Sequence, residues 1–202
     1  MSRIGIMGGT FNPIHYGHLL MAERAYEQMN MDEVWFMPNK NPMYKSIEGN
    51  VTEDDRIAMV ELAIAGNPRF KLNLMELERE GATYTVDTLE ILKKESPDDE
   101  FFFIIGTDSL LQFHTWKDPE RIAQLATILV ATRTSSVSKV DIMEQVYQLH
   151  KNYGATVLHL HYPMIEISSS DIRERAEEGI SIRYTVPEKV ERYIYDNKLY
   201  QK

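Results

Sequence analysis

The chain has 202 residues, of which 43% are hydrophobic and 26% charged, a balance typical of a globular protein that buries its own core. It contains no cysteine, which excludes a disulfide framework, a thiolate metal site and a cysteine nucleophile. The formal net charge is -9, and no basic cluster offers the surface that general nucleic-acid binding requires.

Neither a membrane span nor a secretion signal is expected. No apolar run approaches the roughly 18 residues of a transmembrane helix. The N-terminus enters a strand-like run directly, without the apolar region and cleavage site of a signal peptide. We therefore expect a cytoplasmic protein, with a single domain over residues 1–202.

Apolar strand-like runs alternate with amphipathic helical patterns along the chain. We expect strands at 4–7, 33–37, 70–77, 101–105, 127–131 and 156–160, and helices at 18–29, 54–65, 85–95, 140–152, 170–178 and 187–196, the last with Pro187 at its first position. This alternation predicts a doubly wound α/β fold, with a mostly parallel sheet and helices on both faces. A small helical part is expected at about 168–202. The polar stretch 39–52 is the longest loop, and we expect it to become ordered when ligand binds.

The first strand runs into a glycine turn and the start of a helix. Gly8, Gly9 and Thr10 allow a close approach of the backbone to a phosphate, and the free N–H groups of a helix start attract anions. His15 and His18, three residues apart in the first helical turn, share a face and point toward the phosphate position. A tight turn with two surface histidines is the alternative. Zinc is disfavoured because the pair lacks a third ligand.

A second candidate phosphate element stands near the other end of the chain. A strand-like run ends at Ile167, Ser168 and Ser170 follow, and Arg173 lies in the first turn of the next helix. The arginine fork suits phosphate oxygens. Taken alone, the element could equally be a serine N-cap followed by a solvated arginine.

Both segments resemble a known family. Gly8 to His18 is similar to the signature of the nucleotidyltransferases, and the run Gly-Gly-Thr-Phe-Asp-Pro-x-His-x-Gly-His is typical of bacterial nicotinate mononucleotide adenylyltransferases. Asn12 stands where that family usually has Asp. Ile167 to Arg173 resembles the family's Ile-Ser-Ser-Thr/Ser-x-x-Arg motif. The resemblance implies a Rossmann-like fold and transfer of AMP from ATP to nicotinate mononucleotide, giving nicotinate adenine dinucleotide and pyrophosphate in NAD biosynthesis.

The resemblance implies a phosphate-binding set around ATP. His15 and His18 would surround the α-phosphate, and Arg173 would hold the β- and γ-phosphates. Lys45 would reach the polyphosphate from the long loop, where Met43 and Tyr44 replace the family's Pro and His. The catalytic residues are then His15, His18, Lys45 and Arg173, and the ATP-binding residues are Gly8, Gly9, Thr10, Phe11, Arg133, Ile167, Ser168 and Ser170.

The resemblance also implies an acceptor pocket. The segment 83–88 is similar to the family's Ser/Thr-Tyr-Thr-x-Asp-Thr, which lines the nicotinate nucleotide site, and Gly106 and Asp108 match a Gly-x-Asp that contacts ribose. Trp116 matches a tryptophan that stacks on the pyridine ring. A core tryptophan, or N-caps at Thr85 and Asp108, are the alternatives. The implied acceptor residues are Thr83, Tyr84, Thr85, Gly106, Asp108, Trp116 and Lys117.

The implied reaction is direct in-line transfer. The attacking phosphate monoester has a second pKa of about 6, so neither a general base nor a covalent intermediate is required. Mg²⁺ is expected with ATP, held mainly by the phosphates, and no metal site of the protein's own is expected. ATP and nicotinate mononucleotide are the expected partners, with neither nucleic acid nor membrane, and a homodimer is left open. The alternatives are an adenylyltransferase with a phosphopantetheine or nicotinamide mononucleotide acceptor, and a catalytically silent nucleotide sensor.

Overall fold

The computed structural model describes residues 1–40, 50–131, 139–163 and 165–201. Within them the strands form one six-stranded sheet of order β3-β2-β1-β4-β5-β6, in which every neighbouring pair is parallel. The strands are β1 (Arg3–Gly9), β2 (Glu33–Pro38), β3 (Phe70–Leu72), β4 (Glu100–Gly106), β5 (Thr127–Ala131) and β6 (Val157–Leu160). The doubly wound parallel fold predicted from the sequence is confirmed.

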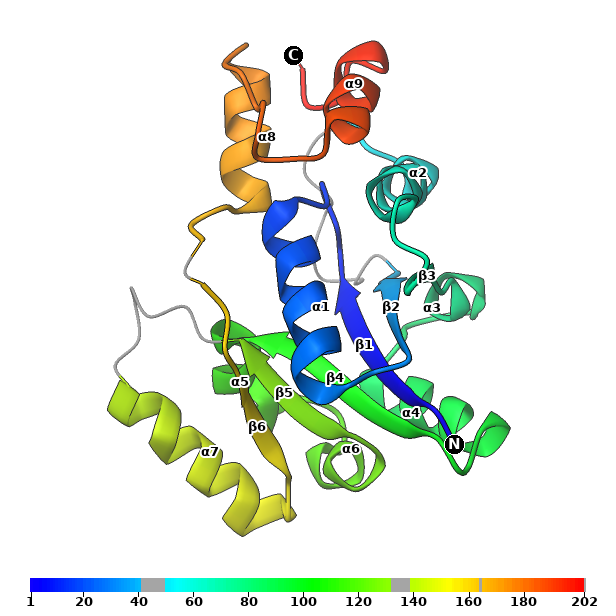
Figure 1. Ribbon diagram of the computed structural model, residues 1–202, viewed down its shortest axis with the longest axis vertical. Coiled ribbons are helices and arrows are strands. Elements are labelled where there is room, and N and C mark those ends of the chain that lie inside the picture. Colours follow the sequence, from blue (N-terminus) through cyan, green and yellow to red (C-terminus); the bar gives the residue numbers. More distant parts are fainter. Residues whose placement is uncertain (41–49, 132–138, 164, 202) are drawn as a thin grey trace.

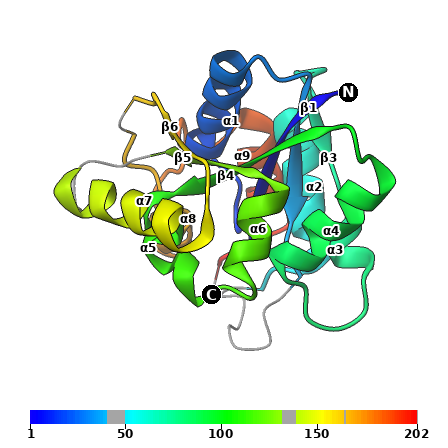
Figure 2. The same ribbon diagram turned by 90° about the horizontal axis from the view of Figure 1, so that it is seen from below.

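Helices cover both faces of the sheet, with α1 on one side and α4, α6 and α7 on the other (Figure 1, Figure 2). The helices of the described residues are α1 (Tyr16–Met29), α2 (Glu53–Ile64), α3 (Met75–Glu78), α4 (Thr85–Glu95), α5 (Thr107–Gln112), the 3₁₀ turn η1 (Phe113–Thr115), α6 (Pro119–Leu125), α7 (Lys139–Tyr153), α8 (Ser169–Glu177) and α9 (Glu188–Asp196). No helix among these residues is long and apolar enough to cross a membrane.

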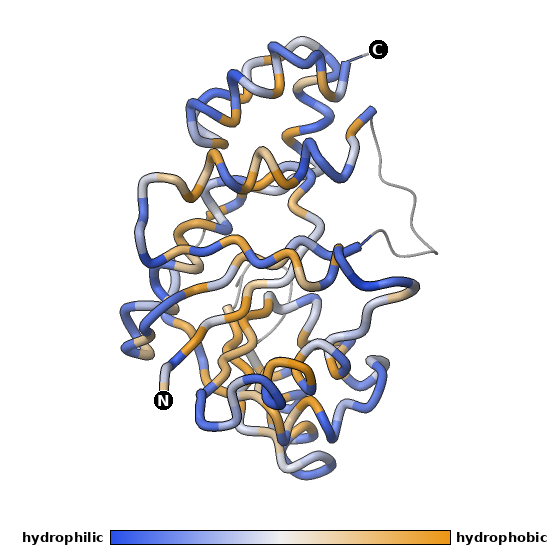
Figure 3. The backbone as a smooth tube through the Cα atoms, turned by 90° about the vertical axis from the view of Figure 1, so that its right-hand side faces the viewer, coloured by the Kyte–Doolittle hydropathy of each residue, from blue (hydrophilic) through white to orange (hydrophobic). Residues whose placement is uncertain are grey.

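The core lies in two layers because successive side chains of a strand point to opposite faces. On β4, Phe102 and Ile104 pack with the residues of α1 and α2. Phe101, Phe103 and Ile105 pack with α4, α5 and α6 instead. Hydrophobic residues accordingly run along the strands and the inner sides of the helices, as Figure 3 shows.

The C-terminal helices continue the first of these layers. Ile172 of α8 and Val190 and Ile194 of α9 belong to the same buried cluster as the residues of α1 and α2. Helix α9 lies beside α2, and α8 is at the same end of the molecule (Figure 1). Tyr193 of α9 also donates a hydrogen bond to the Asp55 carboxylate of α2 at 2.9 Å. The expected C-terminal helical part is therefore present and packed.

Some predicted elements differ from the structure. The expected strand over 70–77 ends at Leu72, because the Asn73 side chain accepts a hydrogen bond from the Met75 N–H at 3.0 Å and turns the chain into α3. The short helices between β4 and β5 were not predicted. Pro187 is the N-cap of α9 rather than its first residue, and Tyr84 rather than Thr85 is the N-cap of α4.

Candidate active site

A cleft of about 1000 Å³ opens at the carboxyl edge of the sheet. The strand order reverses between β1 and β4, which is where ligands of doubly wound folds bind. The predicted site residues that line it are Gly8, Gly9, Thr10, His18, Thr83, Tyr84, Thr85, Gly106, Asp108, Trp116, Lys117, Ile167 and Ser168. Residues of both predicted phosphate elements, far apart in the sequence, therefore meet in one cleft.

The two histidines occupy different layers at the start of α1. His18 lines the cleft, whereas His15 is 2% exposed and does not. Their rings stack with centroids 3.8 Å apart. A Cβ at position 17 would lie 2.9 Å from the His15 ring, so only glycine fits between the histidines. His15 therefore packs behind His18, and its expected contact with the phosphate stays a prediction.

A backbone hydrogen bond sets the proton arrangement of His18. The His15 N–H donates to His18 Nδ1 at 3.3 Å. A neutral imidazole has one donor and one acceptor nitrogen. With Nδ1 as the acceptor, the proton of the neutral His18 ring is on Nε2, which makes that nitrogen a donor.

The turn after β1 has a strained residue that its surroundings hold in place. Phe11 has a φ of 49°, in the left-handed region that residues other than glycine rarely adopt. Its buried ring packs edge-on against His18, with centroids 5.2 Å apart. Arg56 of α2, which is completely buried, donates from Nη1 to the carbonyl oxygens of Thr10 at 2.9 Å and Asn39 at 3.0 Å. Arg56 thus joins the segments that follow β1 and β2.

The C-terminal part holds the same turn from the other side. Ser169 Oγ donates to the carbonyl of Pro13 at 2.9 Å, and Arg173 Nη1 donates to the carbonyl of Asn12 at 2.9 Å. The Tyr200 hydroxyl donates to the side-chain oxygen of Asn12 at 2.7 Å, in a buried contact. Burial raises the pKa of the Tyr200 hydroxyl, so it remains a donor. The family usually has Asp at position 12. The neutral amide of Asn12 accepts this bond without placing a carboxylate in the buried contact.

Ser168 is the N-cap of α8, as the simpler reading of the second element expected. Its Oγ accepts a hydrogen bond from the Asp171 N–H at 3.1 Å and lies 3.0 Å from Ser170 Oγ. Ser168 lines the cleft, but Ser170 and Arg173 do not. Their contact with the β- and γ-phosphates stays a prediction.

The opposite wall of the cleft is aromatic. Trp116 packs against Phe113 and Phe103, with ring centroids 5.1 and 5.9 Å apart, and still lines the cleft. It is therefore both a core residue and a surface available to a ligand. Lys117 places its ammonium 4.7 Å from the centre of the Tyr84 ring, a cation–π contact at the same wall.

Glu76 is a lining residue that the sequence analysis missed. Burial raises the pKa of its carboxyl group, although hydrogen bonds from Thr88 and Thr83 favour the charged form. The sequence pattern placed Glu76 in a strand, so its direction could not be inferred. Other lining residues that were missed include Asn39, Thr107, Ser109, Gln112 and Glu166. The α5 residues could have been suspected, because α5 starts where β4 ends.

Three predicted residues require separate mention. Lys45 and Arg133 lie outside the described residues, as does most of the 39–52 loop. Phe11 is buried behind the cleft rather than in its lining. Among the residues that the structure describes, no group of three or more His, Asp or Glu side chains could hold a metal ion.

Comparisons with known proteins agree with this geometry. Residues 6–175 match the model of the family described as Cytidylyltransferase-like. A protein of Lachnoclostridium phytofermentans named "Probable nicotinate-nucleotide adenylyltransferase" is 46% identical over 99% of this chain and 100% of its own length. A protein of the same name from Geobacillus thermodenitrificans is 42% identical over 99% of this chain and 87% of its own.

A solved structure supports the fold independently. Plasmodium falciparum nicotinic acid mononucleotide adenylyltransferase complexed with NaAD superimposes with a TM-score of 0.79. The match covers 99% of this chain and 98% of the other, at 21% sequence identity. At that identity the likeness concerns the fold.

Proposed function

The chain belongs to the nicotinate-nucleotide adenylyltransferases, and we propose that its cleft achieves the transfer by aligning two phosphates and neutralising the charge that develops between them. The enzyme transfers AMP from ATP to nicotinate mononucleotide, with release of pyrophosphate. The observation that carries the mechanism is the meeting of Gly8–Thr10, His18 and Ser168 at one cleft beside the β1/β4 switch.

The chemical step requires positioning more than proton transfer. A phosphate oxygen of nicotinate mononucleotide forms a bond to the α-phosphorus of ATP, and the bond from that phosphorus to the bridging oxygen breaks. The electron pair leaves with pyrophosphate. Since the attacking monoester is largely ionised at neutral pH, we assign no general base and no covalent enzyme intermediate.

His18 is the residue that we place at the α-phosphate. It lines the cleft beside Gly8 and Gly9, and its hydrogen bond with the His15 backbone makes Nε2 the donor. A neutral donor can stabilise a phosphate oxygen that gains charge in the transition state. The first turn of α1 contains no acidic residue that would offset the positive end of the helix dipole. The dipole therefore adds to the attraction of a phosphate at this helix start.

The remaining assignments divide the cleft into two sides. We propose that the ATP side is formed by Ser168, Ser170, Arg173, Lys45 and Arg133. Thr83–Thr85, Trp116 and Lys117 are proposed for the nicotinate side, with Gly106 and Asp108 at a ribose. Mg²⁺ would enter with ATP and reduce the charge of its phosphates. In this proposal the ion is held chiefly by phosphate oxygens and water. A cytoplasmic location and the homodimer stay predictions.

The first test is turnover of the His18→Ala variant, with pyrophosphate release as the readout. We expect kcat to fall at least about tenfold, which corresponds to about 1.4 kcal/mol in the barrier. His150→Ala is the matched control, because that exposed histidine lies at the end of α7 and does not line the cleft. Near-normal turnover of His18→Ala would remove the proposed role of this histidine.

The acceptor is tested with the unaltered enzyme. Pyrophosphate release from ATP is measured with nicotinate mononucleotide, nicotinamide mononucleotide and phosphopantetheine as separate acceptors. We expect release with nicotinate mononucleotide. Release with phosphopantetheine alone would redirect the acceptor assignment, and ATP binding without release from any acceptor would point to a nucleotide sensor.

A further inference from the structure

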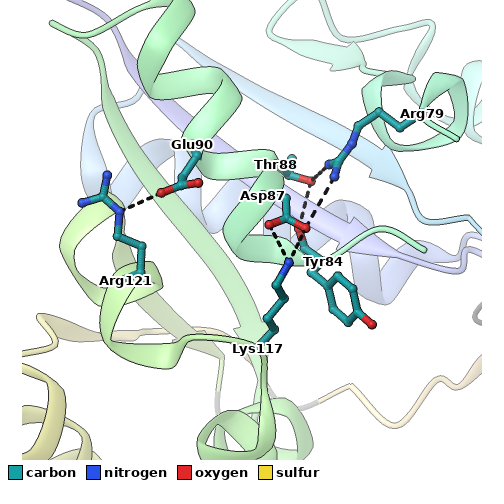
Figure 4. Close-up of polar contacts among 7 residues, drawn as sticks. All are labelled: Arg79, Tyr84, Asp87, Thr88, Glu90, Lys117 and Arg121. Atoms are coloured by element: carbon teal, nitrogen blue, oxygen red, sulfur yellow. Dashed lines mark hydrogen bonds and ion pairs between the residues drawn. The ribbon is translucent and has the colours of Figure 1, made fainter. Parts of the chain in front are cut away.

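Asp87 binds a cleft-lining lysine without lining the cleft itself. Both carboxylate oxygens accept a hydrogen bond from Lys117 Nζ at 2.9 Å, and Arg79 Nη2 lies 3.7 Å from Oδ2 (Figure 4). The same lysine ammonium lies over the ring of Tyr84, another lining residue. Asp87 therefore stands directly behind a lysine–tyrosine contact at the wall of the cleft.

A second set of contacts connects α4 to α3. Arg79 Nη1 donates to Thr88 Oγ1 at 2.9 Å, and Thr88 Oγ1 donates to Glu76 Oε1 at 2.9 Å (Figure 4 shows the first of these). Arg79 thus bonds both Asp87 and Thr88. As a result, Glu76, Tyr84 and Lys117, which line the cleft from three separate segments, are all fixed relative to the first turn of α4.

We propose that Asp87 is a positioning residue that sets acceptor affinity by holding Lys117 against Tyr84. This inference rests on the proposed function, which places the nicotinate nucleotide on this side of the cleft. The lysine side chain is half-exposed and long, so without a partner it samples many rotamers that binding must restrict. A carboxylate that bonds it with both oxygens fixes the ammonium before the anionic acceptor arrives.

Asp87 lies away from the α-phosphate site, so its loss should affect binding of the acceptor and not the chemical step. It contacts no residue that we place at the α-phosphate, and its cleft-lining partner, Lys117, lies on the acceptor side. Loss of the carboxylate should therefore raise the KM for nicotinate mononucleotide, and leave the KM for ATP and kcat nearly unchanged. A purely structural role would instead change all three together.

The chain supplies a matched control one turn further along α4. Glu90 Oε1 accepts from Arg121 Nε at 3.0 Å, which is another half-exposed ion pair between α4 and the segment that follows η1 (Figure 4). Neither Glu90 nor Arg121 lines the cleft. Glu90→Gln thus removes a similar surface ion pair without affecting Lys117.

The experiment compares Asp87→Asn, Asp87→Glu and Glu90→Gln in steady-state kinetics and thermal unfolding. We expect Asp87→Asn to raise the KM for nicotinate mononucleotide about fivefold, Asp87→Glu to recover part of that loss, and Glu90→Gln to match the unaltered enzyme. Equal KM values for Asp87→Asn and Glu90→Gln would overturn the proposal. A rise in the ATP KM as large as that for the acceptor would also overturn it.

A double-mutant cycle tests the route through the lysine. Lys117→Met should raise the acceptor KM, and adding Asp87→Asn to it should cause no further rise. Additive effects would show that Asp87 does not act through Lys117. If the unaltered enzyme releases no pyrophosphate with nicotinate mononucleotide, the proposed function fails. Normal release, combined with an unaffected Asp87→Asn variant, contradicts the positioning role alone.

Discussion

The two sides of the cleft are held by different kinds of contact. On the phosphate side, the turn after β1 is held by Arg56 and Tyr200, which are 0% and 4% exposed. On the acceptor side, Lys117 and Asp87 form an ion pair between side chains that are 49% and 30% exposed. Buried polar contacts are costly to break because the remaining partner stays desolvated. Exposed ion pairs contribute less and are screened by salt.

This difference has a functional consequence. In the proposed mechanism, a rigid phosphate side would keep the α-phosphate geometry constant, which an in-line transfer requires. On the acceptor side, loss of the exposed Asp87–Lys117 pair should leave the fold intact. We therefore expect changes on the phosphate side to lower stability and kcat, and changes on the acceptor side to alter the acceptor KM.

Arg56→Met should have the largest effect. The substitution keeps much of the aliphatic volume but leaves the carbonyls of Thr10 and Asn39 without their buried donor. It also removes a buried cation that lies 3.7 Å from a carboxylate oxygen of Glu53. We expect the free energy of unfolding to fall by about 2–4 kcal/mol, measured by urea denaturation. Arg24→Met, which breaks an exposed pair on α1, is the control. Equal effects of the two variants would contradict the comparison.

The sequence predicted which motif residues meet in the cleft better than it predicted the residues that hold the turn after β1 in place. Motif residues such as Gly9, His18 and Ser168 are found in the cleft because short-range patterns, a strand end followed by a helix start, place them there. The sequence analysis gave Arg56 no role. Its burial depends on carbonyl groups from two distant loops, which no local pattern reveals. The bond between Tyr200 and Asn12 is equally long-range.

The elements that were missed or given the wrong bounds share a physical cause. β3 has three residues and α3 has four, while α5 and α6 have six and seven. Such lengths hold less than two helical turns, so hydrophobic periodicity cannot distinguish them from loops or strands. The longer apolar runs over β2, β4 and β5 left no such ambiguity, and these strands lie within a residue of the predicted bounds.

Tyr200→Phe should produce the next largest effect. It removes only the hydroxyl that donates to Asn12, so the buried Asn12 side chain loses a partner while the packing of the ring is retained. We expect a loss of about 1–2 kcal/mol in unfolding free energy and a several-fold lower kcat with an unchanged acceptor KM. Tyr184→Phe is the control, because that side chain is 80% exposed. A rise confined to the acceptor KM would place Tyr200 on the wrong side of the comparison.

Glu76→Gln should have the smallest effect, and it should depend on pH. Burial raises the pKa of the Glu76 carboxyl in the folded protein above its ordinary value of 4.5, so the folded state favours the protonated form. The stability that this group contributes is fully present below the unfolded pKa and is lost as the pH rises through the folded pKa.

Glutamine does not ionise and can still accept the bond from Thr88. The variant should therefore gain stability relative to the unaltered enzyme between pH 4 and pH 7, as measured by urea unfolding at both values. A difference that is constant with pH would mean that the Thr88 and Thr83 hydrogen bonds compensate fully for the burial of the carboxylate.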